Sequence, residues 1–269
     1  MLSFVLSSVS QVLIAFSLVI LQSAPSLPQS EADGTPPDSS VVYVSPATGT
    51  TQGYATDGTN HYLFSTAGIQ EDDADWNQLY SNANPFSGLP SGVIHVGDGA
   101  YFQGTLFAPV ESFKGCNNVT HQTVAVYAAN RPGLPLVRYS DISANGHEAS
   151  SVTVAPSTNS LYVSSFCDGS KLWIYDLDTL KLKGTLALST NILKIQGISW
   201  NPAQSQFAVT ADSADQKTGY IYLVSASGAV TGPVYTVPQK GELEGVDYTQ
   251  STIRYLIDGR VYFVSLAAR

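Results

Sequence analysis

The stretch Gln196-Gly197-Ile198-Ser199-Trp200-Asn201-Pro202, followed by Gln206-Phe207-Ala208-Val209-Thr210, decides the fold because its pattern recurs along the chain. In each copy a polar residue precedes a short apolar segment, and the apolar centre of the next segment lies 11 residues further on. The five pairs of polar residue and apolar centre are Gln52 with Leu63, His95 with Leu106, Ser150 with Leu161, Gln196 with Phe207, and Glu244 with Tyr255. Because self-similarity at a fixed period is the signature of a repeat architecture, we interpret the chain as five repeated units.

The length of each repeat favours a small sheet of four strands. The five polar positions are separated by 43, 55, 46 and 48 residues, and a four-stranded propeller repeat takes about 40–50 residues. In the third repeat, apolar segments and the turn residues between them predict strands over 151–154, 161–164, 172–175 and 184–188. The first repeat is the least regular, because the acidic stretch 70–76 occupies the place of a third strand. There we expect a long loop, with the third strand near Trp76 to Tyr80.

The last repeat contains only three predicted strands, at 245–248, 253–257 and 260–266. The segment 41–44 has the alternation of a strand and lies just before the first repeat, so we expect it to pair with the last repeat and close a ring. Closure covers strand edges that would otherwise promote aggregation. The sequence therefore predicts an all-β, five-bladed β-propeller over residues 41–269, in one domain closed by an N-terminal strand. A six-bladed, lactonase-like ring and a two-sheet sandwich remain the alternatives.

The motifs Gln52-Gly53, Gln196-Gly197-Ile198 and Glu244-Gly245-Val246 resemble those of the secreted β-propeller superfamily, and the resemblance covers the chain from residue 41 onward. These motifs are generic to propellers and indicate no particular enzyme family. The resemblance implies that the inner strands all begin on one face of the ring, which we call the top face. Loops that join second and third strands open on the same face.

The N-terminal segment has the features of an export signal. Residues 1–24 contain the apolar run 12–21 followed by small residues, as in a signal peptide, and the run is too short to span a bilayer comfortably. No Lys or Arg precedes the apolar run, so an uncleaved anchor remains the alternative. Residues 25–40, rich in Pro and Ser, are expected to form a flexible leader. We therefore expect a secreted, extracellular monomer that does not contact a membrane after signal cleavage.

Composition and charge exclude some classes of partner. The net charge of −9 and the lack of a basic run argue against nucleic acid, which requires clustered Lys and Arg. The two cysteines, Cys116 and Cys167, lack the Cys-x-x-Cys spacing of redox or zinc sites and fall on equivalent loops of adjacent repeats. We expect them to form one disulfide, which would contribute roughly 3 to 4 kcal/mol in the chain-entropy model. Asn118 begins a glycosylation sequon, Asn118-Val119-Thr120.

The polar residue that opens each repeat defines an inner ring on the predicted top face. Buried polar groups require partners, so the ring is expected to hold waters, an ion or part of a ligand. Oxygen atoms of Ser150, Gln196 and Glu244 are ligands that Ca²⁺ accepts, which makes Ca²⁺ a candidate cofactor. A single carboxylate predicts weak binding, and His95 would be an unusual ligand for this ion. The ring is similar in outline to that of secreted calcium-dependent apyrases, which are five-bladed with a central ion.

Acid–base chemistry is the second possibility for this face. His147-Glu148 places a group that titrates near neutral pH beside a carboxylate, and His95 with Asp98 repeats that combination one blade away. The candidate catalytic residues are His95, His147, Glu148 and Glu244. An alternative is that His147 is simply hydrogen-bonded to the backbone. The sequence has no Gly-x-Ser-x-Gly elbow, Walker loop or His-Glu-x-x-His motif.

Loops expected on the top face are acidic and carry an aromatic residue. The acidic residues are Asp72, Asp73, Asp75, Glu111, Asp168, Asp212, Asp215, Glu242 and Asp258. The candidate ligand-binding residues are Gln52, Asp98, Ser150, Gln196, Trp76, Arg138 and Arg260; the ring of Trp76 could stack on a sugar and the arginines could bind a carboxylate. Two hypotheses follow. The first is a propeller that binds an extracellular carbohydrate or small molecule at an acidic, aromatic top face, and the second is a hydrolase or lyase acting on an extracellular glycan or ester.

Overall fold

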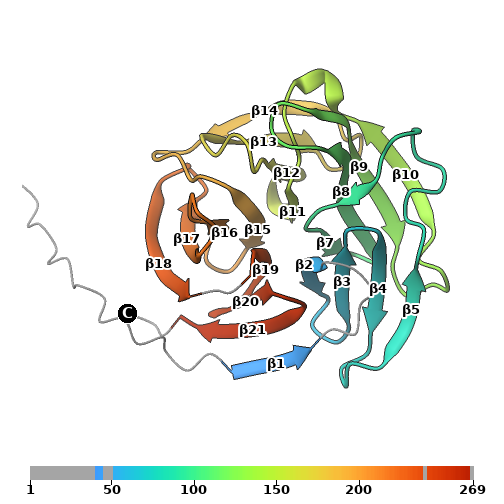
Figure 1. Cartoon of the computed structure of the whole chain (residues 1–269), viewed down its shortest axis with the longest axis horizontal. Helices are drawn as coiled ribbons and strands as arrows, with labels where there is room; N and C mark the ends of the chain where they lie inside the picture. Colours follow the sequence, from blue (N-terminus) through green and yellow to red (C-terminus); the bar gives the residue numbers. More distant parts are fainter. Residues whose placement is uncertain (1–39, 45–50, 239–240, 267–269) are drawn as a thin grey trace, which may run out of the picture. The chain divides into compact units, whose positions relative to one another are not determined.

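The computed structural model describes residues 40–44, 51–238 and 241–266. The predicted signal peptide (1–24) and all of the predicted leader except its last residue lie outside these residues. Within them the strands form five antiparallel sheets arranged in a ring, which confirms the five-bladed β-propeller (Figure 1). The six-bladed ring and the two-sheet sandwich are wrong.

Each blade consists of consecutive strands, numbered outward from the axis except in the last blade. Blade one contains β2 (Thr51–Thr56), β3 (His61–Ser65), β4 (Gly68–Asp72) and β5 (Gln78–Asn82). Blade two contains β6 (His95–Val96), β7 (Ala100–Phe102), β8 (Thr105–Phe113), β9 (Val119–Ala128) and β10 (Leu136–Asp141). Blade three contains β11 (Ser151–Ala155), β12 (Ser160–Ser164), β13 (Lys171–Asp176) and β14 (Leu182–Ala187). Blade four contains β15 (Ile195–Asn201), β16 (Gln206–Asp212), β17 (Thr218–Ser225) and β18 (Val230–Pro238).

Blade five is completed by the other end of the chain. It contains β19 (Leu243–Thr249), β20 (Thr252–Ile257) and β21 (Arg260–Ser265), and β1 (Ser40–Val44) is its outer strand. β1 pairs antiparallel with β21, with Ser40 opposite Phe263 and Val44 opposite Arg260. This pairing confirms the predicted closure of the ring by an N-terminal strand, visible as the blue strand beside the red sheet in Figure 1.

The prediction for the outer half of blade one is wrong. The third strand is β4, which continues through the acidic residues Glu71 and Asp72, and β5 is the fourth strand. The acidic residues are tolerated in the strand because their oxygens accept hydrogen bonds: Glu71 from Asn60 and from the backbone of Asn130, and Asp72 from Gln70. The sequence pattern was misleading because a run of carboxylates usually indicates a loop.

The parallel inner strands are joined to one another through hydroxyl side chains. Ser151 Oγ accepts a hydrogen bond from Ile198 N, and Thr153 Oγ1 accepts one from Trp200 N, both at 2.9 Å. Ser199 Oγ likewise accepts from Tyr248 N at 2.9 Å. Inner-strand amides that have no ladder partner on the axial side are thus satisfied by the preceding blade. These bonds explain why Ser and Thr interrupt the apolar inner strands.

In blade two the inner strand is broken into β6 and β7, and Asp98 occupies the break. Its carboxylate accepts hydrogen bonds from Tyr54 N (3.1 Å), Ser151 Oγ (2.9 Å) and Val246 N (3.4 Å), which belong to blades one, three and five. A Cβ atom on Gly53 would lie 2.5 Å from Asp98 Oδ1, so the glycine leaves room for this side chain. Asp98 is 1% exposed and closes the axis, with one pocket above it and another below.

Candidate functional site

The upper axial pocket is the cavity above Asp98 at the top face, and its volume is about 150 Å³. It is lined by Gln52, His95, Glu111, Phe113, Glu148, Ser150, Phe166, Gln196, Glu242 and Glu244. All five residues of the predicted inner ring lie here, together with Glu148 from the predicted catalytic set. Glu111, Phe113, Phe166 and Glu242 complete the walls; they were not predicted as site residues.

A chain of hydrogen bonds crosses one wall of the upper axial pocket. Gln52 Nε2 donates to Glu244 Oε1 (3.1 Å), and Gln52 Oε1 lies 2.8 Å from His95 Nε2. Because the amide oxygen can only accept, His95 carries its proton on Nε2. Burial lowers the pKa of His95, so the ring is neutral near pH 7. Its Nδ1 atom is then a buried acceptor that has no hydrogen-bond partner among the described residues.

Glu111, the cross-strand neighbour of His95 on β8, and Glu148 form a pair of carboxyl groups in the same pocket, joined by a hydrogen bond between their side chains. Burial raises the pKa of both groups above the ordinary 4.5, and the charge of Glu148 raises that of Glu111 further. A hydrogen bond between two carboxyl groups requires a proton, so the pair retains one proton and titrates as a unit.

The surroundings of the two carboxyl groups differ. Glu148 Oε2 accepts hydrogen bonds from Ser165 Oγ (2.7 Å) and from the backbone nitrogens of Phe166 and Cys167. Within residues 40–44, 51–238 and 241–266, Glu111 Oε2 accepts one hydrogen bond, from Ala149 N at 3.1 Å. Donors stabilise the charged form of a carboxyl group. Glu148 is therefore the carboxylate of the pair and Glu111 the neutral acid.

The predicted calcium ligands line the pocket but have protein partners. Ser150 Oγ bonds Ser164 Oγ (2.9 Å), Gln196 Nε2 donates to Asp212 Oδ2 (3.1 Å), and Glu244 Oε1 accepts from Gln52. Burial raises the pKa of Glu244 well above its ordinary value, and the nearby acidic groups raise it further. In the part of the chain that the structure describes, no group of three or more His, Cys, Asp or Glu side chains is arranged to hold a metal ion. Calcium binding stays a prediction.

His147 does not reach the upper axial pocket. Its Nδ1 lies 2.9 Å from the carbonyl oxygen of Glu148 and its Nε2 lies 2.7 Å from Tyr175 Oη. A carbonyl only accepts, so Nδ1 carries the proton and Nε2 accepts from Tyr175. The ring stacks on Trp173 at 3.9 Å, and burial lowers its pKa. Both nitrogens of His147 are therefore occupied, as in the alternative in which this residue bonds to the backbone.

His147 lines a second cavity, which we call the loop pocket. This cavity of about 710 Å³ lies between the top-face loops of blades two and three, and Glu148 lines both it and the upper axial pocket. Its other walls include Trp173, Lys171 and Asp168, with Lys171 paired to Asp168 at 3.1 Å. The four predicted catalytic residues are thus divided between two cavities. His95, Glu148 and Glu244 line the upper axial pocket, and His147 lines the adjacent loop pocket.

Four of the predicted ligand-binding residues line neither top-face pocket. One is Asp98, which is buried between the blades. Trp76 was expected on the top face, which is wrong: it follows β4, so it lies on the opposite face, where it stacks on His61 with ring centroids 3.6 Å apart. Arg138 donates to the carbonyl oxygens of Leu177 and Asp178 and so joins blades two and three. Arg260 is exposed at the start of β21.

The predicted disulfide is confirmed. Cys116 and Cys167 are bonded, with their Cα atoms 5.5 Å apart, and both line the loop pocket. A disulfide indicates an oxidising compartment. Asn118 of the sequon is exposed in the same loop as Cys116, where a glycan could be attached. Glycosylation stays a prediction. Over the described residues, no helix has the length and apolar character needed to cross a membrane.

Comparison with known proteins identifies the fold. No protein-family model matches the sequence, and no curated protein matches it. Among solved structures, a glutaminyl cyclase from Myxococcus xanthus is similar, with 12% identity over 84% of this chain and 94% of that one, and a TM-score of 0.59. A gluconolactonase from Xanthomonas campestris is similar with 14% identity over 80% of this chain and 71% of that one, and a TM-score of 0.53. At these identities the likeness shows that the chain has a β-propeller fold, and no more.

Proposed function

We propose that this protein is a secreted hydrolase that opens an ester or lactone bond of a small extracellular substrate in the upper axial pocket. The observation that carries the proposal is the hydrogen-bonded Glu111–Glu148 pair on the pocket wall. A pair with one proton offers an acid and a base in the same site, and groups with pKa values raised by burial recur in active sites. Two propellers of similar architecture are named for enzymatic activities, but a shared fold does not assign one to this chain.

Glu148 is suited to be the general base and Glu111 the general acid. In the proposed step, Glu148 takes a proton from water while the water oxygen bonds to the acyl carbon. The carbon–oxygen bond of the leaving group breaks, and Glu111 gives its proton to the leaving oxygen. The proton on Glu148 then passes to Glu111 through the hydrogen bond that joins them, which restores the starting state of the pair.

The remaining walls are suited to holding the substrate. His95 Nδ1 is an acceptor with no partner in the part of the chain that the structure describes, and the Gln52 amide fixes the orientation of the ring. Phe113 and Phe166 contribute apolar surface beside the carboxyl pair. A cavity of about 150 Å³ admits only a reacting group, so the rest of the substrate would occupy the loop pocket, which shares Glu148.

Activity measurements on the carboxyl variants test the proposal. Purified protein is incubated with glucono-δ-lactone and with p-nitrophenyl acetate, and acid release or absorbance is followed. We expect turnover that falls by about 10²–10⁴-fold in Glu148→Gln and in Glu111→Gln, the usual contribution of acid–base groups. The matched control is Asp215→Asn, an exposed loop acid outside the pocket, which should retain wild-type activity. Undetectable turnover by the wild type, or full activity in folded Glu148→Gln, would contradict the proposal.

Carbohydrate binding at the top face without turnover is the second candidate. The loop pocket favours it, because Trp173 lies on its wall beside polar side chains and the cavity is large enough for a ligand. A protein that binds an oligosaccharide there, with a shift of the Trp173 indole N–H signal, but hydrolyses neither substrate would support this candidate over the hydrolase.

A further inference from the structure

A third cavity, the lower axial pocket, lies below Asp98 at the opposite end of the axis. It has a volume of about 660 Å³ and is lined by residues of all five blades, among them Tyr54, Tyr101, Thr153, Trp200, Asp247 and Arg254. This volume falls within the roughly 300–1,000 Å³ typical of small-molecule sites. Because the buried Asp98 carboxylate closes the axis, this pocket is separate from the one proposed for hydrolysis.

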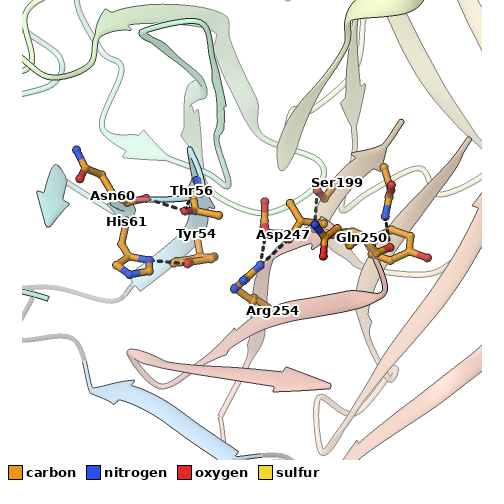
Figure 2. A network of polar contacts seen from close by, with 12 residues as sticks. Tyr54, Thr56, Asn60, His61, Ser199, Asp247, Gln250 and Arg254 are labelled. Carbon is orange, nitrogen blue, oxygen red and sulfur yellow. Dashed lines mark hydrogen bonds and ion pairs between the residues drawn. The ribbon is translucent and has the colours of Figure 1, made fainter. Parts of the chain in front are cut away.

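Arg254 lines the lower axial pocket, and one nitrogen of its guanidinium group, Nη1, bonds to neighbouring side chains. Nη1 donates to Asp247 Oδ2 (3.2 Å) and to Thr249 Oγ1 (2.6 Å), and Figure 2 shows Arg254 pointing toward Asp247. Among the described residues, no hydrogen bond is formed by its Nε or Nη2 atoms. Asp247 and Thr249 thus orient the group and leave the three N–H donors of Nε and Nη2 for a ligand.

Trp200 supplies a further donor. Its indole Nε1 is buried and has no hydrogen-bond partner among the described residues, although its backbone nitrogen bonds Thr153 Oγ1. Buried indole N–H groups usually have a partner. The Trp200 ring packs against Phe207, with ring centroids 4.7 Å apart, at the wall of the lower axial pocket, so an acceptor atom of a ligand would reach Nε1 once the ring turns toward the cavity. Tyr101 and Phe102, both partly exposed, add aromatic surface to the same pocket.

The charged side chains of the lower axial pocket determine whether a neutral or an anionic ligand would bind there. Arg254 is balanced by Asp247; burial raises the pKa of Asp247 to about 6, and Arg254 opposes this increase. Asp57 adds a further carboxylate to the lining, and the chain has a net charge of −9. An anionic ligand would therefore meet net repulsion, whereas a neutral sugar offers hydroxyl oxygens for the free donors and apolar ring faces for the aromatic residues.

From this combination we infer that the lower axial pocket binds a neutral sugar, with its hydroxyl oxygens accepting from Trp200 Nε1 and Arg254. This second binding site is independent of the proposed hydrolase, because it lies on the other side of Asp98 and shares none of the residues that line the upper axial pocket.

The indole N–H signals provide a test that locates the ligand. The chain has three tryptophans: Trp200 lines the lower axial pocket, Trp173 lines the loop pocket, and Trp76 lines neither axial pocket. ¹⁵N-labelled protein is titrated with cellohexaose, xylohexaose and mannohexaose, and Trp200→Phe assigns the signal. We expect at least one neutral sugar to shift the Trp200 signal saturably and to leave the Trp173 signal in place.

Two variants then test the contacts. Arg254→Lys keeps a positive partner for Asp247 but loses the planar fork, and it should raise the Kd about tenfold, which corresponds to about 1.4 kcal/mol. Trp173→Phe is the matched control and should leave the titration of Trp200 unchanged. The inference is overturned if none of the three sugars shifts the Trp200 signal at about 10 mM, if Trp173 shifts in its place, if folded Arg254→Lys binds as tightly as the wild type, or if trigalacturonate binds more tightly than the neutral sugars.

Discussion

Asp98 connects more of the ring than any other single side chain described here, because its carboxylate bonds groups of blades one, three and five. The sequence shows Asp98 as a carboxylate near His95, but it does not predict that the side chain lies between the blades. That position depends on the break between β6 and β7 and on the absence of side chains at Gly53 and Gly245, where a Cβ would collide with it.

Removing this carboxylate should destabilise the ring. In Asp98→Ala, three donors, the backbone nitrogens of Tyr54 and Val246 and the hydroxyl of Ser151, lose a buried acceptor. Each unsatisfied group costs about 1–3 kcal/mol, so we expect the free energy of unfolding to fall by at least about 3 kcal/mol. Urea denaturation measures the change, with Asp215→Asn as the control. A loss below about 1 kcal/mol would mean that Asp98 is not the link between blades that its hydrogen bonds indicate.

The candidate site was predicted in part at the residue level. Alignment of the repeats identified Gln52, His95, Ser150, Gln196 and Glu244 as one ring, since equivalent positions of a repeat must lie at equivalent places around an axis. Glu111 was noted only as an acidic loop residue. It comes from the end of β8, and its contact with Glu148 depends on how two blades pack, which periodicity does not report. A carboxylate directly after the apolar segment 106–110 was the signal in the sequence.

At the level of elements, the strands were predicted best where the repeat was regular. Blades three and four and the closing strand β1 follow the expected order. Blade one differs because hydrogen bonds to Glu71 and Asp72 keep an acidic segment in β4, and the shift of one strand moves Trp76 to the opposite face. The alternation of apolar and polar residues does not show which buried carboxylates have hydrogen-bond partners.

At the level of the whole molecule, buried carboxyl groups determine how stability depends on pH. Burial raises the pKa values of Asp98, Glu111, Glu148, Glu244 and Asp247. Between the ordinary and the raised pKa the folded chain binds more protons than the unfolded chain, so the free energy of unfolding decreases as pH rises.

Burial also lowers the pKa values of His61, His95 and His147, which opposes this trend below about pH 6.5. We therefore expect the free energy of unfolding to decline from about pH 7 toward alkaline pH. Chemical denaturation at a series of pH values across this range measures how the free energy of unfolding changes with pH. Glu111→Gln should give a shallower slope, because one group with a raised pKa is gone, whereas Asp215→Asn should leave the slope unchanged. A free energy of unfolding that rises with pH over this range in the wild type would contradict the raised pKa values of these buried groups.

The central claim, that Glu111 and Glu148 share a proton in the upper axial pocket, is tested most directly by following the glutamate side-chain ¹³C carboxyl signals during a pH titration. In the wild type, the Glu111 signal should titrate well above the ordinary pKa of 4.5, and its midpoint should fall in Glu148→Gln because the neighbouring charge is removed. If Glu111 and Glu148 both titrate at the pKa of an exposed glutamate, the pair does not hold a proton and the proposed acid–base mechanism is wrong.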